Sequence, residues 1–103
     1  MSLPILQASS SETTQIRGDV TIDASAVIAV GVILNATKGN RIIIHSGVCV
    51  GMGTVITAYD GDVEIKSNAI LGAGTLILGK SIIGTHASLG SSVTVYQTNI
   101  DNS

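Results

Sequence analysis

Few side chains in this sequence could do chemistry, and the first candidates are its two histidines, His45 and His86. A catalytic zinc site generally needs three protein ligands plus a water molecule. Two histidines 41 residues apart in the chain therefore fall short of a zinc site within one subunit. A site shared between subunits stays open as an alternative, whereas two solvent-exposed histidines are the simpler interpretation. We expect neither a bound metal nor a cofactor.

The other polar candidates also lack the partners that catalysis needs. Cys49 has no histidine close to it in the six-residue repeat described below, which favours an interface position over a nucleophile. Asp19 and Asp23 flank the start of that repeat, where turn or capping roles suffice. The glycines between residues 47 and 53 are not followed by the Gly-Lys-Ser/Thr of a phosphate-binding loop. The sequence therefore predicts no catalytic residue, and a protein that is not an enzyme.

The composition indicates one small domain built from strands. Of the 103 residues, 45% are hydrophobic, yet there is no Phe or Trp and there are only two Tyr beside 12 Gly. The apolar residues are almost all Val, Ile, Leu and Ala. Aliphatic residues of this kind, many of them β-branched, suit stacked strands better than helices.

Charge and hydropathy disfavour several classes of partner. The net charge is −2 and 12% of the residues are charged, so no basic surface is available for nucleic acid. No segment approaches the ~20 apolar residues of a membrane span, and residues 1–15 lack the basic and apolar regions of a signal peptide. A single cysteine fits a reducing compartment. We therefore expect a cytoplasmic location.

An aliphatic residue recurs every six positions along most of the chain, once two short insertions are allowed. The twelve residues that follow this rule are Ile22, Ile28, Leu34, Ile44, Val50, Ile56, Ile65, Leu71, Ile77, Ile83, Leu89 and Val95. The residue after each is usually small or turn-forming, and the residue four places on is also mostly small. This pattern predicts a parallel β-helix, in which each unit is a short strand plus a corner and three units close one triangular coil. We expect the aliphatic residues inside and Gly, Asn, Asp or Ala at the corners.

About four such coils, residues 16–100, form the predicted β-helix domain, with an N-terminal arm at 1–15 and a tail at 101–103. A mixed α/β domain is the competing interpretation. It requires apolar residues at a period of about 3.6, which no window of a dozen residues shows. The glycine density between residues 72 and 79 would also break helices. The sequence therefore predicts an all-β fold.

Both insertions follow the third strand of a coil, within residues 36–43 and 58–64. They hold Lys38, Arg41, Asp60, Asp62 and Glu64. Solvated loops are the simpler interpretation because loops are usually polar. A charged docking ridge is the alternative.

The residue before each inward aliphatic should point outward, and on two faces of the prism this position is apolar. One row is Val27, Cys49, Ile70 and Ser88, and the next is Ile33, Val55, Leu76 and Thr94. A third row, weaker in apolar residues, is Thr21, Ile43, Glu64 and Ile82. Outward Val and Ile can simply reflect strand propensity. Contiguous exposed apolar surface usually marks an interface, however, and two adjacent faces would let a subunit contact both neighbours in a ring of three. We therefore predict an interface formed by Val27, Ile33, Cys49, Val55, Ile70 and Leu76.

A resemblance to a known family rests on four segments: Gly18-Asp-Val-Thr-Ile, Ser46-Gly-Val-Cys-Val-Gly-Met-Gly-Thr-Val-Ile, Ala69-Ile-Leu-Gly-Ala-Gly-Thr-Leu-Ile and Ser81-Ile-Ile-Gly-Thr-His-Ala-Ser-Leu-Gly-Ser-Ser. Their hexads resemble the hexapeptide-repeat superfamily, whose parallel β-helices are left-handed. Known members include acyltransferases and γ-class carbonic anhydrases, commonly trimers. Within that superfamily the chain resembles the CcmN family of cyanobacterial β-carboxysome assembly proteins.

The resemblance implies a non-catalytic scaffold in the carboxysome, the bacterial microcompartment of photosynthetic carbon dioxide fixation. Such proteins bind the γ-carbonic-anhydrase-like N-terminal domain of CcmM and link the Rubisco-containing interior to the shell. They dock on shell proteins through a short C-terminal peptide, which a sequence ending at Ser103 lacks. We expect the chain to join CcmM in a trimer-like hetero-oligomer without recruiting shell. An acyltransferase using His45, or a zinc-dependent γ-carbonic anhydrase, acting as a trimer, is the alternative.

Overall fold

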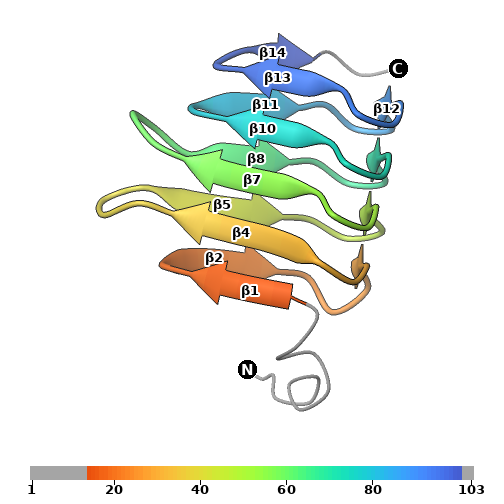
Figure 1. Ribbon diagram of the computed structural model, residues 1–103, viewed down its shortest axis with the longest axis horizontal. Coiled ribbons are helices and arrows are strands. Elements are labelled where there is room, and N and C mark those ends of the chain that lie inside the picture. The colour runs from red at the N-terminus through yellow and green to blue at the C-terminus, as the bar shows by residue number, and fades with distance from the viewer. Residues whose placement is uncertain (1–13, 101–103) are drawn as a thin grey trace.

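The computed structural model describes residues 14–100, which form short β-strands and no helix within that range (Figure 1). The strands are β1 (Thr14–Arg17), β2 (Asp19–Ile22), β3 (Val27–Ile28), β4 (Val32–Ala36), β5 (Arg41–Ile44), β6 (Cys49–Val50), β7 (Val55–Ala58), β8 (Val63–Ile65), β9 (Ile70–Leu71), β10 (Leu76–Leu78), β11 (Ser81–Ile83), β12 (Ser88–Leu89), β13 (Thr94–Tyr96) and β14 (Asn99–Ile100). The predicted all-β fold is confirmed.

Every third strand lies in the same sheet, so the chain winds around three faces. Sheet A has the order β1-β4-β7-β10-β13, sheet B the order β14-β11-β8-β5-β2 and sheet C the order β12-β9-β6-β3. Neighbouring strands pair in parallel, and Figure 1 shows the turns stacked from β1 at one end to β14 at the other. Three strands make one turn, which gives four complete turns and two strands of a fifth. The predicted parallel β-helix of about four coils is therefore confirmed.

The repeat residues form an inward aliphatic ladder in each sheet, and sheet B carries a second one formed by Val20, Ile42 and Val63. In sheet A, Leu34 pairs with Ile56 and Ile56 with Ile77, and equivalent registers run through sheets B and C. All twelve predicted repeat residues lie in these ladders, which also include Ile16 and Ile100. Every ladder residue that has a ladder partner in the turns on both sides is buried. Leu34, between two turns, is fully buried, whereas Ile16 in the first described turn is 51% exposed.

Smaller residues fill the interior beside each corner. Thr54 and Thr75 are buried there, and the hydroxyl of each donates a hydrogen bond to the carbonyl oxygen of Gly72, at 3.3 and 2.7 Å. These bonds satisfy hydroxyls that would otherwise be costly to bury. The interior is therefore closed by short side chains as well as by the aliphatic ladders.

Stacked corners also limit side-chain size where the backbones of adjacent turns meet. A Cβ on Gly51 would lie 2.6 Å from the backbone nitrogen of Ala73 in the next turn. The equivalent Gly90 belongs to the last complete described turn, and a Cβ there would meet nothing within 4 Å. Glycine is thus required at Gly51 by close backbone approach.

Both insertions leave the β-helix at the corner between sheets A and B, as predicted. Residues 37–40 connect β4 to β5 and residues 59–62 connect β7 to β8, and Figure 1 shows both loops projecting beyond the other turns. Thr14 and Gln15 belong to β1, while the rest of the predicted arm and the tail lie outside the described residues. Among the residues that are described, no helix is long and apolar enough to cross a membrane.

Candidate docking surface

The outer side of sheet C carries the first predicted apolar row. Val27 pairs with Cys49, Cys49 with Ile70 and Ile70 with Ser88, so the four side chains stack along the helix axis. All four residues are exposed, and Cys49 is a free thiol in the middle of the row. Because the strands of sheet C are two residues long, this face is one outward side chain wide.

The outer side of sheet A carries the second predicted row and is broader. Ile33, Val55 and Leu76 pair in register with one another and are half-buried, and Thr94 completes the row as an exposed residue. The longer strands of sheet A present a second outward row, which is Asn35, Thr57, Leu78 and Tyr96. The structure therefore brings each predicted set together as a continuous row on its own face.

The corner between sheets C and A joins these two faces, and its apolar character was missed by the sequence analysis. Val30, Met52 and Ala73 occupy equivalent positions in three successive turns of this corner. The Gly53 N–H donates to the Val30 carbonyl at 3.0 Å, and the Gly74 N–H donates to the Met52 carbonyl at 2.9 Å. Val30 and Met52 are both largely exposed. The sequence feature that could have identified this surface is an apolar residue two places after an inward aliphatic, at a corner where turn-forming residues are expected.

The two tyrosines meet near the C-terminal end of sheet A. Tyr96 ends β13, and Tyr59 lies in the loop that follows β7. A hydrogen bond with Tyr96 is the main cause that raises the pKa of Tyr59, and desolvation and the negative charge of Asp60 act in the same direction. Tyr96 itself is an exposed apolar residue beside Leu78 of the neighbouring strand.

The outer side of sheet B is the most polar of the three, as the sequence indicates. Its outward row is Thr21, Ile43, Glu64, Ile82 and Asn99. The Oε2 atom of Glu64 lies 2.7 Å from Nε2 of His45, which sits at the corner between sheets B and C. A carboxylate and a histidine therefore interrupt the apolar side chains of this face.

Among residues 14–100, neither histidine belongs to a cluster of side chains that could hold a metal ion. His45 directly follows the inward Ile44, whereas His86 lies two turns further on and adopts a φ of 63°. No group of three or more His, Cys, Asp or Glu that could hold a metal ion occurs between residues 14 and 100. Cys49 lies in the apolar row of sheet C, as predicted.

Two charged residues of the insertions, Arg41 and Asp62, interact at the corner between sheets A and B. The Arg41 N–H donates to Oδ1 of Asp62 at 2.9 Å, and the Gly61 N–H donates to Oδ1 of Asn40 at 3.0 Å. The Arg41 Nε lies 3.9 Å from Oδ2 of Asp19 in an exposed ion pair, which is worth little in free energy. This arrangement fits ordered, solvated loops.

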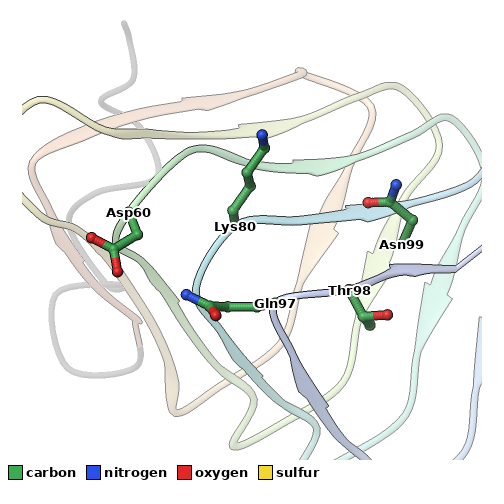
Figure 2. A pocket seen from close by; sticks show the side chains of 5 residues that line it. All are labelled: Asp60, Lys80, Gln97, Thr98 and Asn99. Carbon is green, nitrogen blue, oxygen red and sulfur yellow. The ribbon is translucent and has the colours of Figure 1, made fainter.

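An open hollow of about 450 Å³ lies beside the second loop (Figure 2). Its lining residues are Asp60, Lys80, Gln97, Thr98 and Asn99. Figure 2 shows Lys80 extending away from Asp60, and in the described part of the chain Lys80 makes no ion pair. The lining mixes both signs of charge with amides and presents no convergent catalytic set.

No family model matches the sequence. The carboxysome assembly protein CcmN of Synechococcus elongatus is 48% identical over 101 residues, and that of Synechocystis sp. is 44% identical over the same length. Each match covers 98% of the chain but only 63% and 42%, respectively, of the relative. A chain in the crystal structure of the CcmM N-terminal domain in complex with CcmN is 47% identical, with a TM-score of 0.87 and 88% of both chains covered.

Proposed function

The chain belongs to the CcmN family of carboxysome assembly proteins, and from this we propose that it is a non-catalytic adaptor that binds the N-terminal domain of CcmM. One observation carries the proposal. A chain of the same fold and 47% identity is part of a crystal structure of the CcmM N-terminal domain in complex with CcmN. The proposed location is accordingly the carboxysome.

The proposed contact surface comprises the two apolar rows on sheets A and C. It includes Val27, Ile33, Cys49, Val55, Ile70 and Leu76. Apolar residues stacked in register give a contiguous surface whose burial favours association. The two rows lie on adjacent faces, so one subunit can contact a neighbour through each. This geometry supports a trimer-like hetero-oligomer with CcmM.

The link between the Rubisco-containing interior and the shell is a further part of the proposal. We assign the shell contact to a C-terminal peptide of full-length family members rather than to the β-helix. The supporting observation is that the match covers 63% of the length of one relative and 42% of the other. Those proteins therefore contain further segments, which could make the shell contact.

Isothermal titration of the chain with purified CcmM N-terminal domain tests the proposed function. We expect saturable binding with a negative heat-capacity change, because burial of apolar surface lowers the heat capacity. Parallel titrations with zinc and with coenzyme A examine the enzyme alternatives. Binding of either small ligand with no response to CcmM would contradict the adaptor role.

A further inference from the structure

We infer that the corner between sheets C and A, formed by Val30, Met52 and Ala73, is the centre of the surface that binds the CcmM N-terminal domain. This inference rests on the proposed function and adds the residues that should contribute most to affinity. None of the three belongs to the flat rows from which the interface was predicted.

Apolar side chains on this corner are more exposed than those on the broad face beside it. Val30 is 55% exposed and Met52 is 58% exposed, whereas Val55 and Leu76 of sheet A are half-buried in the free chain. A more exposed side chain has more apolar area left to bury on association. Residues near the centre of an interface also supply most of the binding free energy. Val27 and Ile70 of the adjoining sheet C row are comparably exposed, at 59% and 49%. The corner lies between this row and the row of sheet A, which places it at the centre of the combined surface.

The backbone holds these side chains in a fixed register. The Val30 and Met52 carbonyls accept hydrogen bonds from Gly53 and Gly74 in the next turn, and both glycines adopt left-handed angles with φ of 71° and 73°. A corner fixed in this way loses little backbone freedom on binding. The entropic cost of association is correspondingly low.

The other two corners differ from this one in chemistry. The corner between sheets A and B carries the polar loops 37–40 and 59–62. The corner between sheets B and C places at the position equivalent to Val30 the residues Ala24, Ser46, Ser67 and Thr85. The corner between sheets C and A has no charged residue in any of its four described turns, 29–31, 51–53, 72–74 and 90–92. Desolvating it costs little, as is typical of the centre of a protein–protein interface.

The occupant is the CcmM N-terminal domain rather than a second copy of this chain. A chain of the same fold at 47% identity belongs to a crystal structure of a complex with that domain. The corner also adjoins the rows of both sheets, since Val27 and Ile28 precede it and Val32 and Ile33 follow it. A partner seated on either row therefore reaches the corner.

Titration of CcmM N-terminal domain against three variants tests the inference. Met52→Asp and Val30→Asp each place a charge on the corner, and Ala24→Asp places the same charge at the equivalent exposed position of the corner between sheets B and C. We expect the Kd to rise about 30-fold or more for both corner variants and to stay within about threefold for the control. Thermal unfolding should be unchanged in all three, because the substituted side chains are exposed.

The outcomes separate this inference from the proposed function. If the unmodified chain does not bind CcmM, both fail. If the unmodified chain binds CcmM and the corner variants bind as tightly as Ala24→Asp does, the proposed function is supported. The inference that the corner is the centre of the interface is then contradicted. Corner variants that alter only self-association of the chain, measured by its mass in solution, also overturn it in favour of a second copy.

Discussion

Tyr59 and Tyr96 share a hydrogen bond although they lie in the third and fifth turns of the β-helix. They are the only aromatic residues among the 103. The contact ties the second projecting loop to the C-terminal end of sheet A, and the hydrogen bond raises the pKa of Tyr59. Because the chain has no Trp, this pair is the only source of a tyrosinate signal in alkaline titration.

Replacement of Tyr96 by Phe should lower the pKa of Tyr59 toward its ordinary value while keeping the ring in place. Because the hydrogen bond to Tyr96 is lost, Tyr59 should ionise at lower pH in the variant than in the unmodified chain. In the unmodified chain, the raised pKa of Tyr59 stabilises the fold below the pKa of the unfolded chain, and this contribution is lost as the pH rises through the folded pKa. Near-ultraviolet absorbance during alkaline titration measures this, and an unchanged Tyr59 titration would contradict the hydrogen bond.

The close stacking of turns predicts opposite outcomes at two equivalent glycines. Gly51→Ala should destabilise the fold by about 1–3 kcal/mol, because the new Cβ would overlap backbone of the next turn. Gly90→Ala should be neutral or slightly stabilising, since its Cβ meets nothing within 4 Å and alanine restricts the unfolded chain. Urea denaturation of both variants measures the difference. Equal destabilisation would be inconsistent with the described stacking.

The position of an inward side chain along the sheet A ladder should determine how much its truncation lowers the free energy of unfolding. Ile56→Ala should cost about 2–5 kcal/mol because Ile56 is fully buried between two turns. Ile16→Ala should cost much less, because Ile16 is 51% exposed. The free energies of unfolding from denaturant titration compare the two. A cost at Ile16 equal to that at Ile56 would contradict the partial burial of the first described turn.

The repeat made the interior of this fold predictable, because the hexad places Leu34, Ile56 and their equivalents in the interior regardless of the conformation of the loops. The same periodicity located both insertions at one corner. It could not give the contact between Tyr59 and Tyr96, because the conformation of an insertion is not set by the hexad. Met52 was missed for a related reason, since a repeat that expects turn residues at corners gives no reason to test corner residues as binding residues.

The apolar rows predict a binding defect that should leave the fold intact. Ile70→Asp combined with Leu76→Asp places one charge on each row and should weaken binding of the CcmM N-terminal domain by about 2–4 kcal/mol. Thr21→Asp combined with Asn99→Asp adds the same charge to exposed outward positions of sheet B and serves as the matched control. Isothermal titration compares the two variants, and circular dichroism checks their folding. If the first variant binds the CcmM N-terminal domain as tightly as the unmodified chain, the apolar rows are not part of the interface.

The proposed binding of the CcmM N-terminal domain is tested most simply by the solution mass of this chain, alone and mixed with that domain, from light scattering after gel filtration. We expect a stable mixed species whose mass includes both proteins, with no comparable self-assembly of the chain alone. A homotrimer of the chain that is unchanged by CcmM would contradict the proposed binding.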